Sequence, residues 1–146
     1  MTSYPHLHKQ PETESDWFDA LAALARYLRS PEGCPWDQER TAADFAGFAA
    51  EEVEELCEAL ASNDNDHVAE EFGDCLFTLM ACVAAAEAEG RFTLGNALAR
   101  AHEKLVRRHE HVFRSDKAAT PEEAMVSWQK IKAQEKAEKQ RKKSDE

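Results

Sequence analysis

Four acidic residues in the middle of the chain have types and spacing that suit metal-ion chemistry. Glu52 and Glu55 are three residues apart in the segment EEVEE, and Glu71 and Asp74 are three residues apart in EEFGD. On a helix this spacing places both carboxylates of a pair on one side, about one turn apart. If two such helices pack antiparallel, the four carboxylates converge, and a cation must offset the cost of bringing them together. An all-oxygen ligand set predicts Mg²⁺, with Mn²⁺ as a possible substitute.

The acidic segment 51–58 also fits the solvated face of an amphipathic helix, which is the better interpretation for that segment taken alone. Asp74 favours a metal site over a solvated acidic face. It is the only charged residue between Phe72 and Ala86, and every side of the expected helix around it is apolar. We therefore expect a helix that is buried all round. An aspartate with no functional role is rare in a buried helix, and this favours the metal site.

The elements that must position these residues are helices. Ala, Leu, Glu and Lys dominate, and β-branched residues, glycine and proline are scarce, so we expect an all-α protein. Residues 1–14 are expected to form a flexible arm, 15–137 one helical domain, and 138–146 a disordered basic and polar tail. Apolar periodicity and end signals predict helices over 15–30, 41–62, 66–89, 93–108 and from 120 onward.

The connections between these helices carry two further expectations. The short turn NDND makes helices 41–62 and 66–89 an antiparallel pair. The preceding segment SPEGCPWDQER contains two prolines and a glycine, so we expect a non-helical loop that fixes Trp36 and Asp37. Trp36 either stacks on a base or closes the core, with about equal weight.

Composition limits the classes of partner and the compartment. A length of 146 residues suits one domain, and a formal net charge of -11 argues against general binding to nucleic acid or to an anionic membrane. No apolar run is long enough to cross a bilayer, and the cysteines form no CxxC pair. We expect a soluble, cytoplasmic protein whose cysteines stay reduced. They are Cys34, Cys57, Cys75 and Cys82.

Several motifs in order resemble one family. The acidic pattern EExxE, fifteen residues and ExxD follows the loop GCPWD and precedes the segments KLVRRHEHVF and WQKIKAQEK. Together they resemble the MazG-type nucleoside triphosphate pyrophosphohydrolases, over roughly residues 17–136. The resemblance implies a four-helix-bundle core plus a C-terminal helix, assembled as a homodimer or a dimer of dimers. It also implies Mg²⁺-dependent hydrolysis of an NTP or dNTP to the monophosphate and diphosphate, as housecleaning of the nucleotide pool.

The resemblance also assigns roles by position. It implies that Glu51 supports the metal site or orients the water. Our own candidate for the general base is Glu51 or Glu52. Lys104 and Arg108 are implied to contact the triphosphate and to stabilise the leaving diphosphate. The metal ligands that it implies are Glu52, Glu55, Glu71 and Asp74. The further nucleotide contacts that it implies are Trp128 and Lys132, with Trp36 as a candidate.

The chain departs from the family pattern at two places. Arg40, Thr41 and Ala42 stand where family members have a QTH-like stretch, and Glu110 replaces a proline in the HPHVF motif. The first departure bears on the base pocket and hence on substrate preference, while the carboxylates are unchanged.

Other functions compete less well. A ferritin-like di-iron bundle would need Glu-x-x-His motifs, which are missing. A P-loop NTPase is excluded because the chain has no GxxxxGK[ST]. A non-catalytic module that senses nucleotides or binds a protein remains the alternative, although the intact acidic positions argue against it. His109 and His111 are interpreted as packing or helix-dipole residues rather than as a metal pair.

Overall fold

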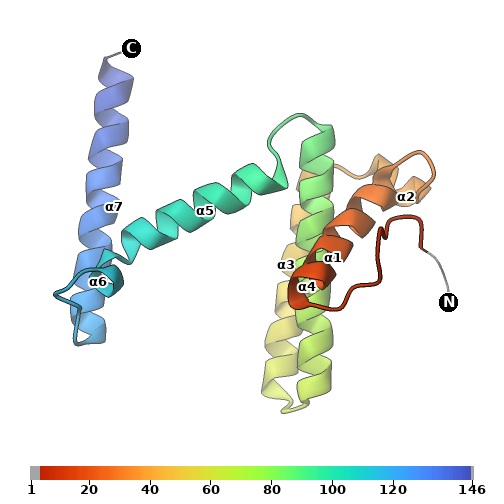
Figure 1. Cartoon of the computed structure of the whole chain (residues 1–146), viewed down its shortest axis with the longest axis horizontal. Helices are drawn as coiled ribbons and strands as arrows, with labels where there is room; N and C mark the ends of the chain where they lie inside the picture. Colours follow the sequence, from red (N-terminus) through yellow and green to blue (C-terminus); the bar gives the residue numbers. More distant parts are fainter. Residues whose placement is uncertain (1–3, 146) are drawn as a thin grey trace. The chain divides into compact units, whose positions relative to one another are not determined.

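The computed structural model describes residues 4–145, which contain seven helices and no strand. The chain divides into two compact units, Met1–Leu94 and Gly95–Glu146, where the sequence predicts one domain over 15–137. The helices, labelled in Figure 1, are α1 (Glu14–Arg29), α2 (Pro35–Glu39), α3 (Ala42–Ala61), α4 (Asn65–Ala88), α5 (Leu94–Arg108), α6 (Glu110–Phe113) and α7 (Pro121–Ser144).

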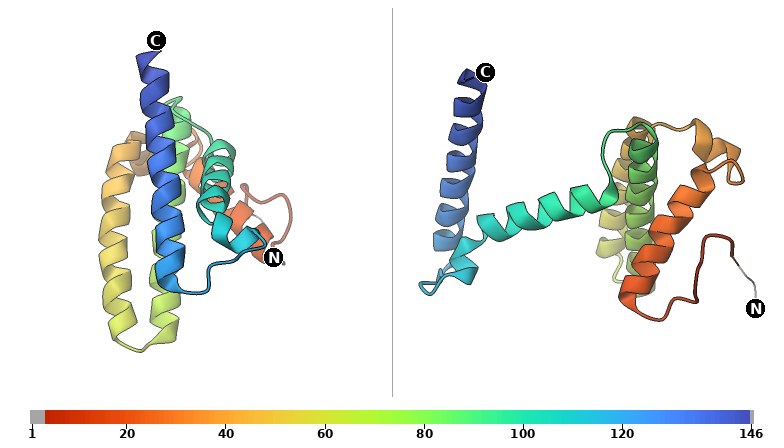
Figure 2. Two further views of the ribbon diagram at one scale, coloured as in Figure 1. Left: turned by 90° about the vertical axis from the view of Figure 1, so that its left-hand side faces the viewer. Right: turned by 45° about the horizontal axis from the view of Figure 1, so that its top comes forward.

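Helices α3 and α4 form the antiparallel pair expected from the sequence, and the left view of Figure 2 shows them side by side. Between them a core of small side chains surrounds Phe45, with Ala81, Ala85 and Ala86 almost fully buried. Alanine at these positions lets the two helices approach closely, so that residues on their facing sides come within reach of one another.

The ends of this helix pair are fixed by polar contacts. Thr41 and Asp44 form a reciprocal capping box at the start of α3, with bonds of 2.9 and 3.1 Å. The Glu89 carboxylate, just after α4, accepts a hydrogen bond of 2.9 Å from the Ala42 amide. Gly90 follows with φ of 70°, the left-handed conformation that ends many helices. The start of α3 is therefore tied to the end of α4.

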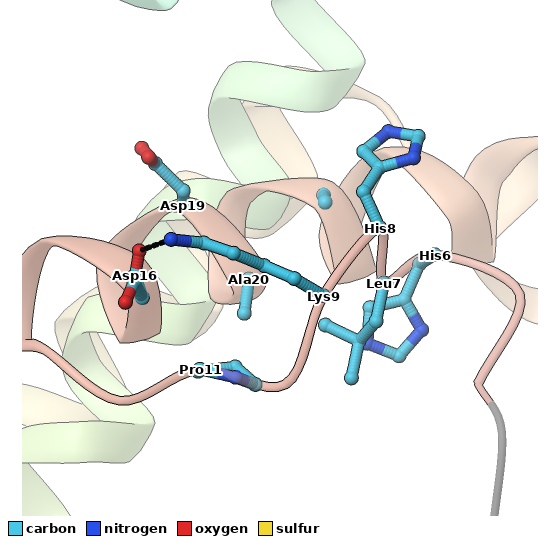
Figure 3. Close-up of a pocket in the computed structure, with 9 residues that line it drawn as sticks. His6, Leu7, His8, Lys9, Pro11, Asp16, Asp19 and Ala20 are labelled. Atoms are coloured by element: carbon cyan, nitrogen blue, oxygen red, sulfur yellow. Dashed lines mark ion pairs between the residues drawn. The ribbon is translucent and has the colours of Figure 1, made fainter.

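Helix α1 packs on α4 and begins at Glu14, one residue before the predicted start at residue 15. Thr13 is the N-cap, and Asp16 is the third helical residue of a capping box. Asp16 also pairs with Lys9 at 2.6 Å, as Figure 3 shows, and this contact places the segment before α1 along the helix. The contact with Lys9 and two backbone amides lowers the pKa of Asp16. Further along, Arg26 of α1 pairs with Glu87 of α4 at 2.9 Å.

The segment before α3 is partly helical, which corrects the expected loop. Pro35 occupies the first turn of α2, where a missing amide costs nothing, and Trp36 and Asp37 lie within this short helix. The Arg29 guanidinium donates to the carbonyl of Asp37 at 2.8 Å, and Gln38 donates to the carbonyl of Ser30 at 2.7 Å. These contacts fasten α2 to the end of α1.

Helix α4 is not buried all round, so that expectation was wrong. Asp74 is exposed, Phe72 and Leu79 are 58% and 50% exposed, while Met80 and Ala84 face the core. Within this unit α3 and α1 cover only part of the surface of α4, and the remaining apolar side chains face outward.

The second unit contains most of α5, together with α6 and α7. Thr120 caps α7 at the predicted start of that helix, its hydroxyl accepting from the Glu123 amide at 3.2 Å. His111 and Ile131 are its buried residues. Helix α7 extends to Ser144, through most of the segment for which the sequence predicts disorder. No helix within residues 4–145 is long and apolar enough to cross a membrane.

Candidate metal centre and adjoining pocket

Three of the four expected metal ligands converge in the first unit. Glu52 and Glu55 of α3 and Glu71 of α4 each offer one carboxylate oxygen, and these oxygens lie within 4.8 Å of one another. The spacing of three residues brings the first two together on one side of α3, and the antiparallel packing brings Glu71 opposite them. Such a set can hold a hard cation.

Glu71 carries the most informative atom of the cluster. Its Oε2 is buried and has no hydrogen-bond partner among the described residues, while its Oε1 lies 3.6 Å from Nδ1 of His67. A buried carboxylate oxygen without a partner is unfavourable unless a cation or water satisfies it. The residues present therefore fit an oxygen-coordinated divalent cation such as Mg²⁺.

The electrostatic effect of this convergence is visible at Glu52. Its partial burial raises the pKa of its carboxyl group, and the neighbouring charges of Glu55, Asp74 and Glu71 raise it further. The pKa of the buried Cys75 thiol is raised by burial and by the nearby carboxylates. The carboxylates thus repel one another, as expected for a cation site.

Asp74 stands apart from the oxygen cluster. It is exposed and lines a pocket of about 530 Å³ together with Glu51 and Glu52, at the edge of the three-oxygen group. Its charge acts on Glu52, but its carboxylate is not part of the group that lies within 4.8 Å. Its role as the fourth ligand stays a prediction.

The other walls of this pocket are aromatic. The Trp36 ring stacks on Phe48 with centroids 5.6 Å apart, and Phe45 meets both rings edge-on at 6.0 Å. Phe77 of α4 also lines the pocket, and Arg40 lies 4.8 Å from the Trp36 ring centroid, against the pocket's aromatic wall. The pocket therefore combines carboxylates on one side with a flat apolar surface on the other.

Sequence reasoning missed the part that the phenylalanines play. Phe48 precedes Glu52 by four residues, so both lie on one face of α3, and Phe77 follows Asp74 by three on α4. This spacing was a usable signal, because apolar residues next to the carboxylates on the same helical faces must line the same pocket.

The remaining expected residues lie in the second unit. Arg108 is half-buried, pairs with Glu135 at 2.9 Å, and places its guanidinium carbon 5.5 Å from the centroid of the Trp128 ring. The side chains of Lys104 and Lys132 are exposed and make no hydrogen bond or ion pair with any residue in the range 4–145. The roles of all four in substrate binding stay predictions.

Comparisons with known proteins identify the family. The family model for the MazG nucleotide pyrophosphohydrolase domain matches residues 41–113, which contain all four acidic positions. The nucleoside triphosphate pyrophosphohydrolase of Escherichia coli K12 is 40% identical over 122 residues, covering 83% of this chain and 46% of that protein. A Thermotoga maritima protein named nucleoside triphosphate pyrophosphohydrolase/pyrophosphatase MazG is 38% identical over 122 residues, covering 84% and 46%.

The chain spans less than half the length of these two relatives. Among solved structures, a mazG-related protein from Thermotoga maritima matches with a TM-score of 0.67 and 29% identity, covering 77% of this chain and 96% of that one. The expectation of an all-α fold of this type with a C-terminal helix is confirmed. The chain belongs to the family of the MazG nucleotide pyrophosphohydrolase domain.

Proposed function

We propose that this chain hydrolyses nucleoside triphosphates, ribo or deoxy, to the monophosphate and diphosphate with Mg²⁺ as its cofactor. The observation that carries the proposal is the convergence of Glu52, Glu55 and Glu71, with one buried oxygen of Glu71 lacking a partner. The names of the relatives and the family membership support the reaction class.

In this proposal Glu52, Glu55, Glu71 and Asp74 hold the metal. Bound Mg²⁺ would supply a water of lowered pKa and would neutralise charge on phosphate oxygens. Glu51, or Glu52, takes one proton from the water that attacks the α-phosphorus, and the bond to the bridging oxygen of the diphosphate breaks. Both side chains line the same pocket as Asp74, which supports a role for one of them as the base.

The aromatic wall is the candidate site for the base of the nucleotide. Trp36 stacked on Phe48 offers a flat surface next to the carboxylates, and base stacking on such a surface tolerates several bases. Lys104, Arg108 and Lys132 would supply cations for the triphosphate, while the stack of Trp128 under Arg108 favours a supporting role for this ring. Such a site suits a cytoplasmic housecleaning enzyme that accepts more than one nucleotide.

The outward apolar side chains of α4 support the homodimer or dimer of dimers that the resemblance implies. Phe72 and Leu79 are at least half exposed in the single chain, and a second copy would cover them. Sedimentation velocity of the purified chain tests this part of the proposal. A monomer at micromolar concentration would contradict it.

The test of activity is a panel of NTPs and dNTPs with separate detection of diphosphate and orthophosphate. We expect Mg²⁺-dependent release of diphosphate, which Glu71→Gln and Asp74→Asn should abolish. Glu70→Gln is the matched control, because Glu70 is an exposed neighbour on the same helix. Release of orthophosphate, or unchanged turnover in both site variants, would contradict the proposal. Mg²⁺-dependent nucleotide binding without any product would instead support a non-catalytic sensing module.

A further inference from the structure

Glu135 on α7 holds two consecutive arginines of α5, and all three residues belong to the second unit. Its Oε1 accepts from Nε of Arg107 at 2.8 Å, and its Oε2 accepts from Nε and Nη2 of Arg108 at 3.2 and 2.9 Å. The family resemblance implied a role for Arg108 but none for Glu135, which no motif argument singled out.

The contact uses only one edge of the Arg108 guanidinium. Nε and Nη2 lie along the edge that Glu135 occupies, so Nη1 and the second hydrogen of Nη2 form a separate fork. Within residues 4–145 no acceptor contacts Nη1. A guanidinium edge with two parallel N–H groups matches two oxygens of a phosphate group.

The face of the guanidinium is fixed as well. Its carbon lies 5.5 Å from the centroid of the Trp128 ring, within the range of a cation–π contact. His109 meets the same ring edge-on at 4.9 Å, which limits the movement of Trp128. One edge and one face of Arg108 are therefore held by the protein, and the other edge is open.

The surroundings of Glu135 keep its contact with Arg107 and Arg108 ionic. The side chain of Glu135 is 16% exposed and that of Arg108 is 21% exposed, so solvent competes only weakly for the contact. Hydrogen bonds from Arg108 and Arg107 hold the pKa of Glu135 below its ordinary value. One carboxylate facing two guanidinium groups leaves a net positive charge for an anion.

We propose that Glu135 is a positioning residue, which orients Arg108 so that its open edge binds the phosphate oxygens of the substrate. The proposal rests on the proposed function in one respect, since it takes the triphosphate as the anion. It differs from a purely structural tie between α5 and α7, which would stabilise the fold without affecting phosphate affinity. It also differs from a competing carboxylate, whose removal would tighten phosphate binding.

The first experiment measures binding of Mg²⁺-tripolyphosphate to the full chain by calorimetry, beside KM and kcat for a dNTP. We expect Glu135→Gln to raise Kd and KM about tenfold, as loss of a charge-assisted contact does, with a smaller change in kcat. Glu138→Gln is the matched control, because Glu138 is exposed on the same helix and makes no ion pair within the described residues. Glu135→Asp, which keeps the charge on a shorter side chain, should recover part of the affinity and serves if the glutamine variant is unfolded.

The second experiment is a double-mutant cycle with Arg108→Ala. If Glu135 acts through Arg108, Glu135→Gln has little further effect on tripolyphosphate affinity once Arg108 is absent. Additive losses, unchanged affinity in Glu135→Gln, tighter binding, or no tripolyphosphate binding by the unmodified chain would each overturn the proposal. If the chain binds tripolyphosphate with this coupling but releases no diphosphate from nucleotides, the proposed function fails and the positioning role stands.

Discussion

Glu71 on α4 and Glu52 on α3 direct carboxylate oxygens into the same small volume, and no lysine or arginine among the described residues pairs with either. Among residues 4–145, the only basic group that pairs with either carboxylate is the His67 ring, 3.6 Å from Glu71. Uncompensated carboxylates destabilise a fold, and they persist where function requires them. The charges of these two carboxylates therefore affect both the stability of the fold and the binding of a metal ion, and both effects can be measured.

The first prediction concerns metal removal. Mg²⁺ at a hundredfold excess over its Kd should stabilise the chain by about 2.7 kcal/mol and raise its melting temperature. Glu71→Gln should melt at a higher temperature than the unmodified chain in EDTA, because it removes one repelling charge, and should lose most of the Mg²⁺ effect. Differential scanning fluorimetry measures both.

Two controls separate binding from general screening in this experiment. KCl at matched ionic strength screens the carboxylates without occupying the site, so it should produce a much smaller shift than Mg²⁺. Glu70→Gln should retain the full Mg²⁺ shift. Equal shifts with both salts would show that no specific site exists.

The second prediction tests whether Asp74 is a ligand, since it stands at the pocket edge rather than within the three-oxygen group. Asp74→Asn should weaken the binding of Mg²⁺ by at least about tenfold, because an uncharged amide oxygen is a poorer ligand for a hard cation. Titration with Mn²⁺ followed by electron paramagnetic resonance gives the affinity directly. An unchanged affinity would leave Asp74 as a pocket residue only.

How far the sequence predicts the fold is clear from the helix ends. Thr120 is recognisable as a cap because proline follows it at the first helical position and glutamate stands three positions later. The sequence also predicts a helix start at residue 41, where Thr41 caps α3 with Asp44 three positions later. Thr13 and Asp16 show the same spacing at the start of α1, although the predicted helix begins at residue 15. Helix α2 was missed because proline was interpreted as a helix breaker, although Pro35 lies at the first turn, where proline is well tolerated.

The site shows a different limit. The convergence of Glu52, Glu55 and Glu71 follows from residue spacing and one short turn, which are local properties. The exposure of Asp74 depends on which sides of α4 other elements cover, and that is a property of the tertiary arrangement. The Glu135 contact joins residues of α5 and α7 that are separated by 27 and 28 positions in the sequence, and no local sequence pattern predicts it.

The third prediction concerns the close approach at Gly33, which helps to hold α2 and Trp36. A Cβ atom at this position would lie 2.3 Å from the carbonyl oxygens of Tyr27 and Leu28, so the loop must move in Gly33→Ala. We expect a loss of roughly 1–3 kcal/mol in the free energy of unfolding. We also expect weaker nucleotide binding through displacement of Trp36. Urea denaturation and tryptophan fluorescence measure the two effects.

Gly47 supplies the matched control for that substitution. It lies in α3, where an added Cβ meets nothing within 4 Å. Gly47→Ala should stabilise the chain by roughly 0.5–1 kcal/mol, because alanine favours the helix. If Gly33→Ala were as stable as Gly47→Ala, the close approach would not constrain the loop.

The fourth prediction concerns the pH dependence of the contact between α1 and α4. Hydrogen bonds from Arg26 and from the Leu94 amide lower the pKa of Glu87 below its ordinary value. A lowered pKa in the folded state means that the contact stabilises the fold above the unfolded pKa of about 4.3 and is lost as the pH falls through the folded value. Because Arg26 is about half exposed, we expect a contribution of roughly 1 kcal/mol near neutral pH.

Glu87→Gln isolates this contribution. The difference in free energy of unfolding between the unmodified chain and the variant should be largest at neutral pH and should shrink below about pH 4, where the unfolded chain becomes protonated first. Urea denaturation at a series of pH values measures it, with Glu58→Gln on the exposed face of α3 as the control. A difference that stayed constant down to acidic pH would mean that the Glu87 charge does not contribute, and that the Arg26 contact depends on its neutral hydrogen-bonding groups alone.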